Sequence, residues 1–343
     1  MFTYGKKKLW FQEVESNSIN SRGVLNIINS NLYELEFSYW KLCFAMAKTT
    51  VSRDISDISL LFDALGNFFQ LGFLVYSNND VFTLNKRHFS NLRDFTRTSR
   101  TGEVAQGITY LLAQEYLRFN SVVDFEGYIN SRGGIIPAKS STPDFIMQNH
   151  NLNFNVGLIE SKGSYPEKSD PVKSSLKKAL KQCHSGQNLL TNFDPRYTIT
   201  NKYGVHIKFE DELSSQSSVG YLADPQSLPV RDERNLSIIR YHYASWFMLM
   251  GDQDNAFRLA TNEPLKIDDA FFRNKNEYYY YGRRSNSVFP IFDIFWTGFQ
   301  IAIPRAIIEL LMGDILEAPS YDSIDTLQVI QYIDGVRLIK LQF

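Results

Sequence analysis

The sequence predicts an α/β protein built around a central mixed β-sheet flanked by helices. Three observations lead to this fold class. The middle of the chain alternates between helical and strand-like patterns in the order α-β-β-β-α-β-β. The run Val156-Gly157-Leu158-Ile159 is apolar on both faces, as in a buried central strand. The 343 residues exceed what one compact domain usually needs, so we expect two or three domains or one elaborated core.

The central region, residues 96–230, begins with a helix at 102–119, where apolar residues share one face. A long helix from about residue 170 to 190 and two more strands, YGVHIKFE and SVGYLAD, complete this region. Between the two helices we predict three strands, at Val122–Ile129, Asp144–Gln148 and Phe154–Lys162. The core order is therefore α-β-β-β-α-β.

The region before it, residues 1–95, is predicted to be mostly helical, with helices at Leu32–Ala47 and Ile55–Phe69. A β-hairpin is expected around Ser77-Asn78-Asn79-Asp80. This pattern fits a winged-helix-like module or, as is commoner, a helical subdomain capped by a hairpin. The polar stretch Asn91–Thr101 is predicted to be a linker or loop.

The region after the core, residues 231–343, is predicted to be an α+β addition that can pack on the core. It holds a helix at 235–251 and a strand pair around Asp334-Gly335. The most apolar stretch, Phe289–Met312, is interrupted by charged residues and by Pro304. This composition predicts a buried helix with a proline kink or break and not a membrane span.

Composition excludes several classes of function. The net charge of −1 excludes a uniformly basic surface, so any nucleic-acid contact needs locally gathered positive charge. Cys43 and Cys183 are far apart and belong to no CxxC pair, which argues against a disulfide framework or a structural zinc site. The five histidines form no HxxxH or HxH pair. The basic N-terminus lacks the apolar core of a signal peptide, and we expect a cytoplasmic protein.

Asp144, Glu160 and Lys162 are the candidate catalytic group. Asp144 begins one predicted strand, and Glu160 and Lys162 end the next strand of the same hairpin. Antiparallel pairing brings the start of one strand beside the end of the other. Glu160 and Lys162 are two residues apart and therefore share a face. The pattern predicts two carboxylates and one ammonium at one end of a hairpin.

This combination suits phosphodiester hydrolysis. Two close carboxylates repel each other unless a positive charge lies between them, and their hard oxygen atoms suit Mg²⁺. A neighbouring lysine can orient or deprotonate a water. A bound metal ion stabilises charge on the phosphate and lowers the pKa of its water. The alternative is a turn aspartate and a solvent-facing pair on a strand, but charges that end a buried strand are costly without a purpose.

Pro143-Asp144 and Glu160-Ser161-Lys162, in this order of elements, resemble the PD-(D/E)XK nuclease superfamily, which has the restriction-endonuclease-like fold. The resemblance covers residues 100–225. It implies that Asp144 and Glu160 bind Mg²⁺, which Mn²⁺ can replace, and that Lys162 is the catalytic lysine. The family often has another acidic residue on its first helix, matched by Glu103 as a further metal ligand. Its second helix often carries Gln or Lys facing the site, matched by Gln182 or Lys181.

The long helix after the hairpin carries Lys173, Lys177 and Lys181 at intervals of four residues. Such a row is either a solvated basic face or a phosphate-contacting face. Beside a nuclease site we favour nucleic-acid binding.

The resulting expectation is a Mg²⁺-dependent endonuclease that hydrolyses DNA through a metal-activated water, without a covalent intermediate. Family habits suggest restriction or antiviral defence against phage. An RNA substrate, or a non-catalytic nuclease-like module for nucleic-acid binding or assembly, remains open. Because double-strand cleavage by this fold often needs two copies, a homodimer or a partner subunit is also expected.

Overall fold

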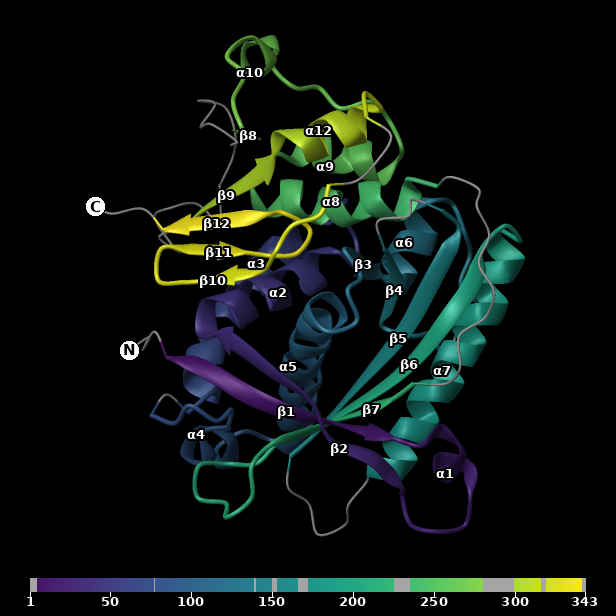
Figure 1. The fold of residues 1–343 in the computed structure, drawn as a ribbon, viewed down its shortest axis with the longest axis vertical. Coiled ribbons are helices and arrows are strands. Elements are labelled where there is room, and N and C mark those ends of the chain that lie inside the picture. The colour runs from purple at the N-terminus through teal and green to yellow at the C-terminus, as the bar shows by residue number, and fades with distance from the viewer. Residues whose placement is uncertain are drawn as a thin grey trace.

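The computed structural model describes residues 5–76, 78–138, 140–149, 153–165, 172–224, 235–279, 299–315 and 319–340. Its larger sheet has seven strands in the order β2-β1-β7-β6-β5-β4-β3 (Figure 1). The β1–β7 and β5–β6 pairs are parallel and the other four pairs are antiparallel. The predicted α/β class with a mixed sheet flanked by helices is therefore confirmed. The strands are β1 (Lys6–Val14), β2 (Ile27–Ser38), β3 (Ser121–Asp124), β4 (Phe145–Gln148), β5 (Asn155–Ser164), β6 (Thr198–Lys208) and β7 (Val219–Ala223).

Two long helices cover opposite faces of this sheet, α5 (Asp94–Glu115) and α7 (Val172–Phe193). A Cβ added to Gly163 of β5 would collide with the backbone of Thr101 in α5. A Cβ added to Gly204 of β6 would instead meet Leu180 of α7. Gly204 lies opposite Glu160 in the parallel register, so both residues face α7. Glu160 and Gly163 are three residues apart on β5 and therefore face opposite sides of the sheet. The two glycines allow both helices to approach the sheet closely.

The N-terminal region differs from the prediction. It is not mostly helical, because β1 and β2 form strands that extend the seven-stranded sheet. The helix predicted from Leu32 begins only at Tyr39, where Ser38 accepts a hydrogen bond from Lys41 N as the N-cap. The predicted linker is also wrong beyond Arg93, because α5 begins at Asp94. The helices here are α1 (Ser16–Asn20), α2 (Tyr39–Val51), α3 (Ser59–Leu74) and α4 (Lys86–Ser90).

Two further predictions are corrected near the core. The predicted strand Val122–Ile129 ends at Asp124, because the Asp124 side chain accepts a hydrogen bond from Gly127 N (2.7 Å) and starts α6 (Phe125–Ser131). Ser77 lies outside the described residues. Of the hairpin predicted around it, the described residues show only an isolated antiparallel bridge between Val75 and Leu84.

The C-terminal region is α+β, as predicted, and carries a five-stranded sheet in the order β10-β11-β12-β9-β8. The strand pair predicted around Asp334-Gly335 is confirmed as β11 and β12, with Gly335 at a positive φ of 87° in the turn. Its helices are α8 (Ser237–Leu249), α9 (Gln253–Ala260), α10 (Asp269–Arg273) and α12 (Arg305–Met312). Its strands are β8 (Tyr278–Tyr279), β9 (Phe299–Pro304), β10 (Ile324–Asp325), β11 (Val329–Gln331) and β12 (Arg337–Lys340).

The helix predicted at Phe289–Met312, with a kink or break at its proline, is only partly correct where the structure describes it. Residues 289–298 lie outside the described residues, Phe299–Pro304 form β9, and α12 starts directly after Pro304. Proline lacks an N–H and has a fixed φ, so it suits the position just before a helix better than a helix interior. Among the described helices, none has the length and apolar character to cross a membrane.

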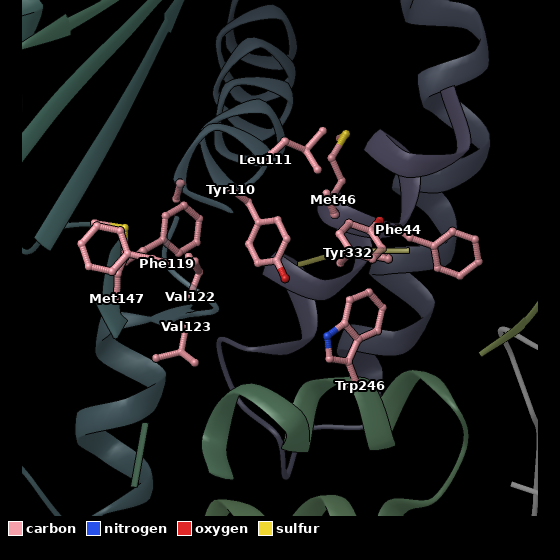
Figure 2. Packing of buried hydrophobic residues seen from close by; sticks show 14 of the residues in the cluster. Phe44, Met46, Tyr110, Leu111, Phe119, Val122, Val123, Met147, Trp246 and Tyr332 are labelled. Atoms are coloured by element: carbon pink, nitrogen blue, oxygen red, sulfur yellow. The ribbon is translucent and has the colours of Figure 1, made fainter. Parts of the chain in front are cut away.

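One hydrophobic cluster joins residues from all three predicted regions. Figure 2 shows Tyr110 of α5, Trp246 of α8 and Tyr332 of the β11–β12 turn packed around each other, with Phe44 and Met46 of α2 nearby. The ring centroids of Trp246 and Tyr332 are 5.2 Å apart, and those of Tyr110 and Tyr332 are 6.4 Å apart. Helices α2 and α5 therefore share one hydrophobic core with the C-terminal region.

Candidate functional site

The fold brings Asp144, Glu160 and Lys162 together at one end of the β4–β5 pair. Asp144 directly precedes β4, and Phe145 lies opposite Ile159 in the register. Asp144 N donates a hydrogen bond to Glu160 Oε2 (2.7 Å), and Ser161 N donates to Asp144 Oδ2 (2.8 Å). The Lys162 ammonium forms an ion pair with the Glu160 carboxylate. Two backbone N–H groups thus hold the carboxylates in a fixed relation to each other.

Burial makes both carboxylates difficult to ionise. Glu160 is only 1% exposed, and burial together with the negative charge of Asp144 raises its pKa to about 8. Burial likewise raises the pKa of Asp144, against the hydrogen bonds from Ser161 N and Gln106. The Lys162 side chain is 31% exposed, so this end of the cluster opens to solvent. When both carboxylates are ionised, a single lysine leaves a net negative charge that a cation would neutralise.

Gln106 and Arg53 complete the group, and neither was predicted as a site residue. Gln106 of α5 donates from Nε2 to Asp144 Oδ1 (2.8 Å). Arg53, which follows α2, donates from Nη2 to Gln106 Oε1 (3.2 Å). Gln106 does lie on the polar face of its helix, a signal present in the sequence. Arg53 comes from the region before the core, and its position depends on tertiary packing alone.

Glu103 lies one turn before Gln106 on α5. It forms an ion pair with Arg100 (2.5 Å) and accepts a hydrogen bond from Ser99 Oγ (3.2 Å). The structure therefore places Gln106, and not Glu103, in hydrogen-bond contact with the candidate catalytic group. Glu103 remains a neighbour on the same side of the helix.

Gln182 contacts the segment that leads into Asp144. It donates from Nε2 to the Thr142 carbonyl (2.8 Å), two residues before Asp144. Gly186, one turn further along α7, gives the space that the ring of Pro143 occupies. Gln182 therefore positions the backbone of the site, while Lys181 is exposed on the outer side of α7.

Asp124 is a further acidic residue near the site that the sequence did not indicate. It pairs with Phe145 across β3 and β4, next to Asp144 in the sequence. Burial raises the pKa of Asp124 to about 7, and the charge of Asp144 adds to this effect. Its hydrogen bond from Gly127 N shows that it also caps α6.

The row of lysines lies on α7, which covers the sheet face toward which Glu160 points. Lys177 and Lys181 are exposed, whereas the Lys173 ammonium donates to the Gly23 carbonyl (2.5 Å). The exposed members give this helix a locally basic surface.

The donor atoms at the site fit a hard divalent cation. Each oxygen of Asp144 and Glu160 accepts one protein hydrogen bond, which leaves a lone pair on each for a further ligand. In the described ranges, no three His, Cys, Asp or Glu side chains group as a metal-holding cluster. A cation here would therefore rely on two carboxylates and several waters, which suits Mg²⁺.

No protein-family model, curated protein or solved structure matches this chain.

Proposed function

We propose that this protein is a Mg²⁺-dependent endonuclease that hydrolyses phosphodiester bonds in DNA at the Asp144–Glu160–Lys162 site. One observation carries the proposal: the buried carboxylate of Glu160 and the half-buried one of Asp144, both with raised pKa values, are held together by backbone hydrogen bonds beside a partly exposed lysine. Keeping such a charged group buried costs stability, so its presence favours a functional role.

The order of elements supports assigning the core to the restriction-endonuclease-like fold. Helix α5, strands β3, β4 and β5, helix α7 and strand β6 follow one another as the PD-(D/E)XK resemblance implies. The short helix α6 is an addition between β3 and β4.

In this proposal Asp144 and Glu160 would hold the cation, and Mn²⁺ could replace Mg²⁺. The ion, when bound, supplies charge stabilisation for the phosphate and a lowered pKa for its water. Gln106 fixes the orientation of Asp144 through its 2.8 Å hydrogen bond. Lys162 has a partly exposed ammonium, paired with Glu160, that can orient the attacking water.

Binding of the nucleic acid would use the basic face of α7. Lys177 and Lys181 are exposed there and can contact backbone phosphates. We extend the proposal to a cytoplasmic role in restriction or antiviral defence, with a homodimer or a partner subunit providing the second cut.

Cleavage assays test the proposal directly. Purified protein is incubated with plasmid, linear DNA and RNA, with Mg²⁺, Mn²⁺ or a chelator. We expect metal-dependent DNA cleavage that Asp144→Ala and Lys162→Ala abolish. Matched controls are Asp254→Ala and Lys6→Ala, which remove residues of the same types from exposed surface pairs.

Cleavage that persists unchanged in Asp144→Ala and Lys162→Ala would refute the assignment of the site. Preferential cleavage of RNA would change the proposed substrate from DNA to RNA and would leave the proposed hydrolytic mechanism unchanged. Absence of cleavage under every condition, combined with tight nucleic-acid binding, would favour the non-catalytic binding module.

A further inference from the structure

A second polar pocket lies at the opposite end of β5 from the candidate catalytic group. Its cavity of about 400 Å³ is lined mainly by Phe154, Arg196, Asn235, Ser237, Arg240 and Asn262. Phe154 precedes Glu160 by six residues, which along a strand is roughly 20 Å. None of the lining residues is acidic. The pocket is therefore separate from the Asp144 site and opposite in charge.

Arg240 is the central feature of this pocket, because its charge is buried without a carboxylate. The residue is 9% exposed. Its Nη1 donates to the Leu311 carbonyl (2.5 Å), and its Nη2 donates to the Glu263 carbonyl. Within the described chain, Nε has no hydrogen-bond partner and no ion pair involves this guanidinium. Burial lowers its pKa, as expected for a positive charge that lacks a counterion.

Arg132 places a second guanidinium beside the first. Its Nη2 donates to Asn262 Oδ1 (3.0 Å) and to the Ser237 carbonyl (3.3 Å), while its Nε has no partner among the described residues. The charge of Arg132 further lowers the pKa of Arg240, so the two cations disfavour each other. Asn262, which accepts the hydrogen bond from Arg132, has a positive φ of 67°, the left-handed conformation common just after the C-terminus of a helix, here α9.

The N-terminus of α8 adds to the positive potential. This helix of 13 residues starts at Ser237, and its N-cap residue Leu236 provides no side-chain cap. Asn235 Oδ1 accepts from Ser237 N (2.9 Å), so one of the terminal N–H groups is satisfied. The remaining N–H groups and the helix dipole favour an anion at this end.

Arg196 forms the outer wall of the pocket. Its guanidinium carbon lies 4.6 Å from the ring centroid of Phe154, and an ion pair with Asp194 (2.8 Å) holds it there. The side chain is 62% exposed, so its face toward solvent remains within reach of a ligand. Its Nε and Nη2 donate to the Asp194 carboxylate (3.0 and 2.8 Å), so a phosphate would contact the remaining donors of the guanidinium.

We propose that this pocket binds a phosphate group, held between Arg196, Arg240 and the N-terminus of α8. The ligand would supply the counterion that the buried Arg240 and the half-buried Arg132 lack among the described residues. The phosphate can belong to a free nucleotide or to the backbone of a nucleic acid, and these sources share the same contacts. The site is independent of the proposed cleavage chemistry, since it uses none of its residues.

Binding measurements on the full chain test this proposal. Isothermal titration with inorganic phosphate, ATP and a short DNA duplex is performed in chelator, which suppresses cleavage. We expect saturable phosphate binding and a higher unfolding temperature with phosphate than with chloride at equal ionic strength. Arg196→Ala and Asn262→Asp are each expected to weaken binding about tenfold. Tighter binding of ATP or of the duplex then identifies the source of the phosphate.

Two features of the design keep the outcome interpretable. Asn262→Asp preserves a residue type that tolerates the left-handed conformation, and its carboxylate would neutralise the pocket without truncating Arg240. Arg97→Ala, which removes an exposed arginine from α5, is the matched control and should bind as wild type does. Absence of saturable phosphate binding to the wild type, or wild-type affinity in both pocket variants, would overturn the proposal.

Discussion

In two buried polar clusters of this protein, the pKa values of the carboxyl groups shift in opposite directions. In the Asp144–Glu160–Lys162 site, burial raises the pKa of both carboxylates. In the cluster around Asp334, burial acts in the same direction. There, however, the hydrogen bond from His242 and the charges of His242 and Lys48 outweigh burial and lower the carboxyl pKa.

The Asp334 cluster is saturated with donors. Asp334 Oδ2 accepts from His242 Nε2 (2.7 Å) and Trp246 Nε1 (2.9 Å), and Oδ1 accepts from Val336 N (2.9 Å). The Val122 N–H donates to His242 Nδ1 (3.0 Å), so the imidazole proton lies on Nε2 and points at Asp334. This network ties the β11–β12 turn to α8 and β3.

The difference separates a structural cluster from a candidate functional one. Asp334 has partners that compensate its burial, so its ionised form stabilises the fold. Asp144 and Glu160 are held close together with one lysine, Lys162, paired to Glu160, so the fold tolerates the two carboxylates at a cost. An added cation would remove that cost, which is the physical reason to regard the first cluster as a ligand site.

The largest expected effect would come from Asp144→Asn. This change keeps the shape of the side chain but removes its charge, and we expect DNA cleavage to fall by about 10²–10⁴-fold. The change removes a charge that is costly to bury, but it also replaces one of the two oxygens that accept from Gln106 and Ser161 N by an NH₂ group, so the free energy of unfolding without metal should change little. Cleavage rates and urea denaturation measure the two quantities. A large loss of stability would show that this cluster is structural, like that of Asp334.

Asp334→Ala should instead lower the stability of the protein and leave its cleavage activity nearly unchanged. It leaves His242, Trp246 and Lys48 without their carboxylate, and we expect the free energy of unfolding to fall by about 3–5 kcal/mol. Urea denaturation gives this value, and cleavage by the remaining folded protein should be close to that of wild type. Asp254→Ala, at an exposed pair on α9, is the control and should change stability little. Normal stability of Asp334→Ala would contradict the structural role.

The response to acid sharpens the comparison. Burial and the charge of Lys48 lower the pKa of His242 from 6.5 to about 4. Its contribution to stability is therefore full above pH 6.5 and is lost as the pH falls toward 4. The loss is up to about 3 kcal/mol. Asp334, whose pKa is also lowered, acts in the same direction at still lower pH.

The measurement is the free energy of unfolding from pH 8 to pH 4 for wild type and His242→Gln. The variant should be less stable at pH 7 and should lose less stability on acidification. His88→Gln, on the short helix α4, is the matched control. An unchanged pH profile in His242→Gln would show that the imidazole is not the group that titrates.

The smallest expected effect belongs to Gln106→Ala, which removes one hydrogen bond to Asp144. We expect cleavage to fall about tenfold, because a hydrogen bond to a charged group contributes roughly one to three kcal/mol. Glu103→Ala, one turn earlier on α5, discriminates between the two helix positions. A larger loss in Glu103→Ala than in Gln106→Ala would restore Glu103 as a direct member of the site.

Local patterns in the sequence were sufficient for the centre of the molecule. The alternation and apolar run around Glu160 predicted β5, and the pairing of β4 with β5 placed Asp144 beside Glu160 as expected. The prediction failed where local preference was weak. Residues 32–38 carry a helical spacing of apolar side chains but form part of β2, because pairing with β1 decides their conformation.

The sequence by itself determined the fold class and the closeness of Asp144, Glu160 and Lys162, since strand periodicity and hairpin pairing are short-range properties. Only the tertiary structure decided that Gln106 and Arg53 join this group, and that Arg132 and Arg240 meet beside the start of α8. The physical reason is that these contacts join segments far apart in the chain. Their geometry depends on how helices pack against the sheet, and no local pattern of residues encodes it.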